Sequence, residues 1–438
     1  MDRQVPLEVW SHSFSESCLK KNDLRNLTRT CVRFRAAARP LLWRVFEIEA
    51  PPRPTTQIAD DIEDMEAKQE TTARQIDSWA EQLLTFSTRV LGARPGEGAP
   101  KDLVRAIIFK GNSELLDLYN YYDSSEDDDN TSESSRDPKG LSSEQLLRAS
   151  YLRLLKCFDA VLAHFPNVAT LKFTDVPITP RLLSQLSSML CIHQLILEQC
   201  TVELAASNQP LPSLQTLKLA RCSLNTVDNS GKYAPHPLPP TRLFEAQVIR
   251  RLEGINLSHH SDQFLSELQN PLPFLTHLAL QVSNDKLLVF IRILEHIPLL
   301  QSLHISHERD GWHHPREKFE PHNWDVISLQ RSALPHLCRF AGTPEALSVF
   351  IPGRPVEEID VVMDTKRSPE EEEDIVKILF SDISQSLQPI HSLRFKSVRA
   401  RTSIFDLIAL NCPELRTLGL DLRVKAKDYR NGAYFDQF

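Results

Sequence analysis

The sequence predicts an α/β chain built from repeated strand-and-helix units, with a short helical segment in front of them. Five segments share the form P-x-(L/V)-x-x-L-x-(L/F/I), namely FPNVATLKF, LPSLQTLKL, LPFLTHLAL, IPLLQSLHI and CPELRTLGL. The alternating apolar residues at the end of each segment indicate a half-buried strand. Between the segments the apolar spacing becomes helical, as in Leu182, Leu183, Leu186 and Leu190, or in Leu287, Phe290, Ile291 and Leu294.

The first fifty residues predict small helices. Pro6 suits the first turn of a helix because its φ is fixed. A second helix is expected from an N-cap at Asn22 or Asp23 until Pro40 stops it. One face of that helix would carry Leu24, Leu27, Cys31 and Phe34. So small a segment buries little apolar surface alone, which implies a partner.

Four blocks of this segment, VPLEVW (5–10), DLRNL (23–27), CVRFR (31–35) and PLLW (40–43), resemble the F-box in the form common in fungal proteins. The usual signature has Leu where this chain has Val5, and an aliphatic residue where it has Ser13. We therefore assign residues 1–50 to an F-box and 51–101 to a linker and helical segment.

The resemblance implies that this segment docks on the Skp adaptor of a cullin-RING ubiquitin ligase, while a C-terminal repeat domain holds the substrate protein. It implies no catalytic residue and no cofactor in the chain itself. The adaptor contacts carried over from the family are Pro6, Leu7, Val9, Leu24, Leu27, Phe34, Leu41, Leu42 and Trp43.

Other interpretations of the N-terminal segment remain open. The helices could form a hairpin that only packs on or caps the rest of the chain. An F-box protein could also act as a scaffold that binds partners without degrading them. Arg25, Arg29 and Arg33 recur every four residues, which usually marks a solvated stripe, and no base-reading Asn or Gln accompanies them.

Residues 102–438 carry the repeats, and the central apolar residues of the copies are Leu171, Leu195, Leu217, Ile255, Leu278, Leu303, Phe340, Ile359, Leu393 and Leu418. Their intervals are 24, 22, 38, 23, 25, 37, 19, 34 and 25 residues, most of them within the range of leucine-rich repeats. The pattern predicts an irregular leucine-rich-repeat solenoid with a curved parallel sheet and helices on the convex side. A doubly wound α/β domain would also alternate strands and helices, but it would lack this recurring phase.

The beginning of the array contains an acidic insertion. Val104, Ile107 and Phe109 have strand spacing and could cap the array. Residues 121–144 are acidic, rich in Ser and nearly free of aliphatic residues, so we expect disorder there. A helix from about 142 to 164 should follow.

The phase of L-x-x-L-x-L predicts which residues face a partner, because the residues that alternate with the buried leucines point to the other face of the sheet. The predicted substrate-binding residues are Lys172, Glu198, Lys218, Asn256, His277, His304, Asp360, Arg394 and Lys396. Two insertions, 223–246 and 307–333, should emerge on one rim, and the second contributes Trp312 and Trp324 as candidate anchors.

Composition and the absence of known motifs disfavour several further classes of function. The formal net charge of −8 disfavours a nucleic-acid partner, and no apolar run is long enough to span a membrane. The eight scattered cysteines fit reduced thiols in the cytoplasm or nucleus. The chain has no phosphate-binding or nucleophile motif, and the histidine-rich segment 307–333 lacks the cysteines of a typical zinc site.

Overall fold

The computed structural model describes residues 20–50, 62–91, 100–112, 142–227, 240–256, 272–282, 287–306, 329–330, 333–363, 368–399 and 402–422. The chain has a mixed α/β fold with helices and a large parallel sheet, which agrees with the α/β class predicted from the sequence. It divides into two compact units, one of residues 1–214 and 220–238 and one of 215–219 and 239–438.

The first unit contains four parallel strands in the order β1-β2-β3-β5 and a separate three-stranded sheet in the order β4-β6-β8. Its elements are α2 (Lys21–Thr30), α3 (Val32–Trp43), β1 (Val45–Glu49), α4 (Ile62–Leu91), α5 (Pro100–Leu103), β2 (Ala106–Lys110), α7 (Ser143–Leu162), β3 (Thr170–Thr174), β4 (Pro177–Ile178), α8 (Pro180–Ser187), β5 (Gln194–Glu198), β6 (Thr201–Ala205) and β8 (Ser223–Val227).

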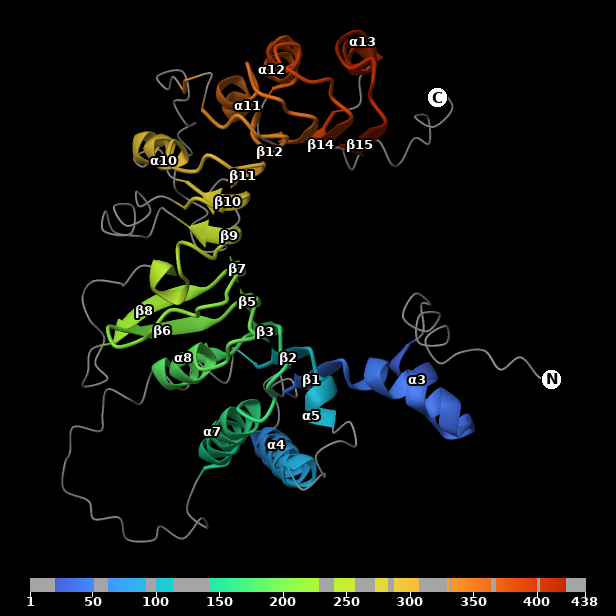
Figure 1. Cartoon of the computed structure of the whole chain (residues 1–438), viewed down its shortest axis with the longest axis vertical. Coiled ribbons are helices and arrows are strands. Elements are labelled where there is room, and N and C mark those ends of the chain that lie inside the picture. The colour runs from blue at the N-terminus through green and yellow to red at the C-terminus, as the bar shows by residue number, and fades with distance from the viewer. Residues whose placement is uncertain are drawn as a thin grey trace. The chain divides into compact units, whose positions relative to one another are not determined.

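The second unit continues the same pattern with parallel strands in the order β7-β9-β10-β11-β12-β13-β14-β15. The elements are β7 (Thr216–Ala220), the 3-10 turn η2 (Pro240–Leu243), β9 (Arg251–Asn256), β10 (His277–Gln281), α10 (Leu287–Leu294), β11 (Ser302–Ser306), β12 (Arg339–Gly342), α11 (Pro344–Phe350), β13 (Glu358–Val362), α12 (Pro369–Ile383), β14 (Ser392–Val398), α13 (Thr402–Asn411) and β15 (Thr417–Leu422). Helices α11, α12 and α13 lie together on one side of the strands that they connect (Figure 1).

The core of each unit consists of the apolar residues that alternate along the strands. In the first unit Phe46, Ile107, Leu171 and Leu195 are register partners on neighbouring strands, and Ile107, Leu171 and Leu195 are buried. In the second unit one row joins Leu252, Leu278, Leu303, Phe340, Ile359, Leu393 and Leu418. Only Leu418, on the edge strand, is exposed among these, so the predicted core phase is confirmed.

The same hydrogen-bond arrangement recurs at the start of successive strands. The carbonyl of Arg44 accepts hydrogen bonds from the backbone N–H groups of both Arg105 and Ala106. The carbonyl of Arg105 likewise accepts from Ala169 and Thr170, and in the second unit the carbonyls of Gln215, Arg250, Thr276, Gln301, Cys338, Glu357 and His391 each accept from two successive residues of the next strand. This repetition shows that the strands are held by one repeated backbone geometry, although their sequences vary.

Helices α4 and α7 pack along each other beside the first unit's strands (Figure 1). Ser142 caps α7, because its Oγ accepts from Gln145 N at 3.2 Å while its N–H donates to Gln145 Oε1 at 3.0 Å. Phe158 of α7 is buried against Phe109, with ring centroids 4.6 Å apart. The helix predicted from 142 to 164 is confirmed, but residues 143 and 144 belong to it and not to the acidic segment. Residues 121–141 lie outside the described residues.

The structure corrects the predicted second helix of the N-terminal segment. Cys31 is extended, with φ −154° and ψ 165°, so it separates α2 from α3 and does not continue a single helix. Helix α2 begins at Lys21, one or two residues earlier than the N-cap predicted at Asn22 or Asp23. Pro40 does not end α3, which continues to Trp43.

Further predictions about the repeats are wrong. Leu252, not Ile255, is the register partner of Leu217 and Leu278, because a bulge at Gly254, where φ is 74°, shifts Ile255 to Leu280. Leu190 is exposed beyond the end of α8, although Leu182, Leu183 and Leu186 are buried as expected. The 223–246 insertion is not entirely a loop, since its first residues form β8 beside β6.

Candidate functional site

The predicted adaptor residues that the structure describes lie on α2 and α3. Leu24 is buried, so little of it remains for a partner. The side chains that remain partly exposed are Leu27, Phe34, Leu41, Leu42 and Trp43. Pro6, Leu7 and Val9 lie outside the described residues.

The two helices form a hairpin through local contacts at Cys31. Phe34 N donates to Cys31 Sγ at 3.4 Å, and Arg35 Nε donates to the carbonyl of Thr28 at 3.0 Å. Val32, at the beginning of α3, is 78% exposed. The hairpin therefore presents apolar side chains to solvent while its turn is fixed by the first residues of α3.

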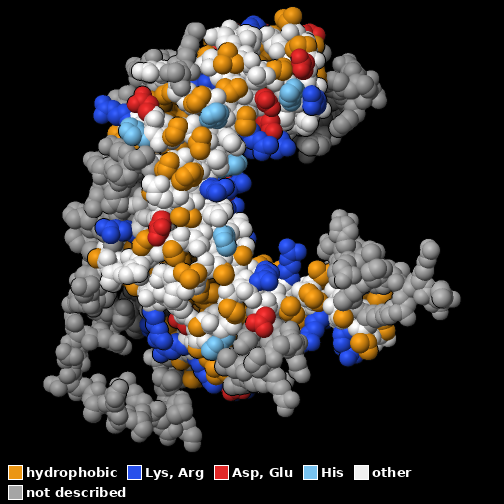
Figure 2. Space-filling view, viewed as in Figure 1, with side chains coloured by type: hydrophobic (Ala, Val, Ile, Leu, Met, Phe, Trp, Pro, Cys, Tyr) orange, Lys and Arg blue, Asp and Glu red, His pale blue; other side chains and the backbone are white. Residues whose placement is uncertain are grey.

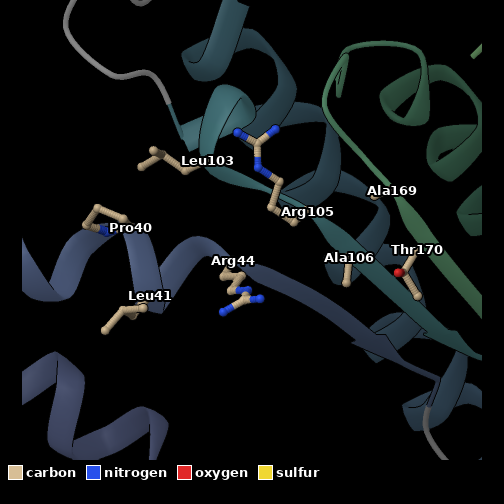
Figure 3. A pocket seen from close by; sticks show the side chains of 8 residues that line it. All are labelled: Pro40, Leu41, Arg44, Leu103, Arg105, Ala106, Ala169 and Thr170. Atoms are coloured by element: carbon tan, nitrogen blue, oxygen red, sulfur yellow. The ribbon is translucent and has the colours of Figure 1, made fainter. Parts of the chain in front are cut away.

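Helix α3 leads directly into β1, and a pocket of about 590 Å³ lies at this junction. It is lined by Pro40, Leu41, Arg44, Leu103, Arg105, Ala106, Ala169 and Thr170. Figure 3 shows Pro40 and Leu41 on one side of it and Ala106 and Thr170 on the other. Of these residues, only Leu41 is among the partner contacts predicted from the sequence, because the positions of the others follow no repeat interval.

In the first unit, the face of the strands opposite the core carries charges of both signs. Lys172 Nζ and Glu198 Oε2 are 2.7 Å apart, which places these two predicted substrate residues in one ion pair. Lys110 forms a similar pair with Glu47 at 2.9 Å, and this hydrogen bond raises the pKa of the lysine. Such partly exposed pairs contribute little stability, so their main effect is to fix side-chain positions.

The corresponding face of the second unit contains the other predicted substrate residues. Lys218, His277, His304, Asp360, Arg394 and Lys396 occupy alternating positions on their strands and are at least partly exposed. Asn256 lies in β9, and its side chain is outside the described residues, as are Trp312 and Trp324. The alternation therefore brings the described members to the face opposite the core, as predicted.

Several ion pairs lie on this second face. Lys396 Nζ lies 2.9 Å from Asp360 Oδ2, and Arg339 Nη2 lies 2.9 Å from Glu358 Oε1. Arg251 pairs with Glu253 on β9. In the view of Figure 2, neither sign of charge forms a continuous patch over the described residues. The face thus suits a folded protein or a peptide with mixed charge.

Arg394 differs from these paired residues, because no carboxylate contacts it among the described residues. Its side chain lies across Gly419 of β15, where an added Cβ would come within 3.0 Å of Arg394 Cγ. Arg394 is exposed and its guanidinium is available to an acidic partner.

His277 is shielded on the same face. Burial, together with the nearby Arg251 and Arg339, lowers its pKa below the usual 6.5. Its Nδ1 lies 2.9 Å from Thr276 Oγ1. The imidazole is therefore neutral at neutral pH and adds no charge to the face.

One buried residue was missed by the sequence analysis. Arg354 is 1% exposed, and its guanidinium donates to the carbonyls of Gln330, Ala333, Val349 and Pro352. It follows Gly353 in a segment that is typical of a surface turn. Nothing in the local pattern indicates that the side chain folds inward.

No group of three or more His, Cys, Asp and Glu side chains could hold a metal ion in the part of the chain that the structure describes. Among those residues, no helix is both long and apolar enough to cross a membrane.

A comparison of the chain with models of protein families gave no match, and neither did a search of curated proteins.

Proposed function

We propose that the chain is the substrate-recognition subunit of a Skp-cullin-F-box ubiquitin ligase. The observation that carries this proposal is the ordered series of four F-box blocks within residues 5–43. Three of these blocks fall on α2 and α3, where Leu27, Phe34 and Trp43 are among the apolar side chains left partly exposed. An apolar surface of this kind is typical of a partner-binding site.

The second part of the proposal is that the parallel strands belong to an irregular leucine-rich-repeat solenoid that binds the substrate. The recurring P-x-L-x-x-L-x-L phase and the repeated carbonyl arrangement at the start of the strands support it. The chain would supply no catalytic group. It would act in the cytoplasm or nucleus by holding a substrate near the ubiquitin-conjugating enzyme, which raises the effective concentration.

Truncating Leu41 and Leu42 together to Ala tests the adaptor contact. Each large apolar side chain that is fully buried contributes about 1.5–3 kcal/mol, so we expect at least a tenfold loss of affinity for a purified Skp-type adaptor. Isothermal titration calorimetry would measure it. This pair is preferable to Trp43, which has an interaction within its own chain.

Val32→Ala is the matched control, because Val32 is an exposed apolar residue of the same helix outside the predicted contacts. Both variants should unfold at temperatures close to that of the original chain. If the Leu41 and Leu42 variant binds the adaptor as tightly as the original chain, the F-box assignment is wrong.

Arg394→Glu tests the substrate face. An acidic partner would then meet a like charge, so we expect about tenfold lower capture of the substrate with unchanged adaptor binding. Proteins that co-purify with the chain under proteasome inhibition can be quantified by mass spectrometry. Lys396→Glu is a poorer choice, because it would place a second carboxylate next to that of Asp360.

Arg292→Glu, an exposed change on α10, provides the control for net charge. If the original chain, Arg394→Glu and Arg292→Glu all capture the substrate equally, this face is excluded as the receptor surface. A substrate that accumulates equally with and without proteasome inhibition would favour a scaffold that does not direct degradation.

A further inference from the structure

We propose that the pocket between α3 and β2 binds a segment of the adaptor in which a carboxylate side chain stands beside an apolar one. This inference rests on the proposed function and adds a second contact outside the F-box helices. It would extend the adaptor interface from the hairpin onto the first strands of the sheet.

The backbone fixes the two arginines of the pocket immediately before the neighbouring strands β1 and β2. The carbonyl of Arg44 accepts from Arg105 N at 2.9 Å and from Ala106 N at 3.1 Å. The carbonyl of Arg105 accepts from Ala169 N at 2.8 Å and from Thr170 N at 3.1 Å. Both arginines therefore start from rigid positions in the sheet, and binding would order little more than their side chains.

Neither arginine is neutralised by a carboxylate within the part of the chain that the structure describes. Both side chains are exposed, and no carboxylate pairs with them among the described residues. Arg105 Nη1 donates to the carbonyl of Asn167, at 3.3 Å, which leaves the charge of the guanidinium unpaired among the described residues. In Figure 3 the two guanidinium groups point away from each other. Each planar guanidinium could bind a carboxylate through two parallel hydrogen bonds.

Apart from Thr170, the rest of the lining is apolar. Pro40 and Leu41 contribute from α3, Leu103 from α5, Ala106 from β2 and Ala169 from the residue before β3. Leu41 belongs both to this pocket and to the predicted adaptor contacts, so the two surfaces are continuous. A volume of about 590 Å³ accommodates a few side chains of a bound segment.

This combination favours a protein segment over nucleic acid. Two cations beside five apolar residues provide few phosphate contacts, and no aromatic side chain lines the pocket for base stacking. A segment with a carboxylate beside an apolar side chain would pair with a guanidinium group and contact the apolar lining at the same time.

The test measures the affinity of the full chain for a purified Skp-type adaptor by calorimetry at low and high salt. The double variant Arg44→Gln with Arg105→Gln should bind about tenfold more weakly at low salt and lose much of the salt dependence. Ala169→Leu should also weaken binding, because it fills the pocket without changing charge and keeps the backbone hydrogen bonds. This second variant keeps the test decisive if the arginine variant unfolds.

Arg250→Gln is the matched control. Arg250 is exposed, and its carbonyl also accepts from two successive residues, Thr276 and His277, but it lies outside the pocket. The affinity of the Arg250→Gln variant for the adaptor should stay within twofold of that of the original chain. If the original chain binds the adaptor and neither pocket variant weakens that binding, the pocket proposal is overturned while the F-box proposal stands. If the original chain does not bind the adaptor, both fall.

Discussion

Replacing Arg354 by Met should lower the free energy of unfolding by about 3–5 kcal/mol. The guanidinium donates to Gln330 O at 3.0 Å, Ala333 O at 3.0 Å and Val349 O at 2.9 Å, with a further bond to Pro352 at 3.2 Å. Methionine fills similar space but donates no hydrogen bond. Buried carbonyls that lose their partner cost about 1–3 kcal/mol each.

The charge of Arg354 is stabilised by its surroundings. Val349 is near the end of α11, where unpaired carbonyls carry partial negative charge that favours a cation. Burial lowers the pKa of Arg354 to about 10, which still leaves the side chain protonated at neutral pH. The hydrogen bonds therefore persist under physiological conditions.

Urea denaturation of the purified chain would measure the effect of Arg354→Met. Arg339→Met is the control, since Arg339 forms only an exposed pair with Glu358 and should change the stability by less than about 1 kcal/mol. Arg354→Lys should lie between the two, because an ammonium keeps the charge but cannot reach all four carbonyls. Equal stability of the Met variant and the original chain would show that the buried guanidinium contributes nothing net.

The positions of the buried residues in each strand could be predicted from the sequence, because burial of one face requires apolar residues to alternate along the strand. A leucine shifted by one position would point to solvent, so each strand keeps its apolar residues in register with its neighbours. That constraint identified Leu171, Leu195 and Leu303 as core residues and placed their neighbours on the other face. It failed at Leu252, where the bulge at Gly254 breaks the alternation within one strand.

Other features depend on backbone conformation that these residue types do not reveal. Asp175, Gln199 and Arg221 have φ near 59°, 57° and 57° directly after β3, β5 and β7. This left-handed conformation is usually signalled by Gly or Asn, so the turns into the three-stranded sheet were not predicted. Cys200 and Cys222 follow two of these turns, and their thiols donate to the carbonyls of preceding strands.

The pocket was unpredictable for a different reason. Its residues Arg44, Arg105 and Ala169 immediately precede successive strands of the sheet, but helices α4 and α7 separate them along the chain. Their intervals of 61 and 64 residues are far longer than those of the repeats. A search for a fixed period therefore cannot align these positions, although the carbonyl of each residue accepts hydrogen bonds from two successive backbone N–H groups.

Gly111→Ala should destabilise the first unit by about 3 kcal/mol. A Cβ at this position would lie 2.1 Å from the carbonyl oxygen of Asp175 and 2.4 Å from Tyr151 Oη. The carbonyl cannot withdraw easily, because Gly111 N donates to Thr174 O at 2.7 Å and Asp175 N donates to Glu198 O at 2.9 Å. Without this clash the same change would stabilise the chain by about 0.4–1 kcal/mol, because alanine restricts the unfolded state more than glycine does. Whether the free energy of unfolding falls or rises therefore decides whether the clash exists.

Two further variants separate the contributions to the clash when thermal unfolding is followed by circular dichroism. Adding Tyr151→Phe removes the hydroxyl but leaves the backbone oxygen, so it should not restore the stability of Gly111→Ala. Gly419→Ala is the control, because its Cβ would meet only the side chain of Arg394, which is exposed and can move aside at little cost. If Gly111→Ala unfolds at or above the temperature of the original chain, the close approach of β2 to the turn at Asp175 is wrong, and with it the packing of α7 at that point.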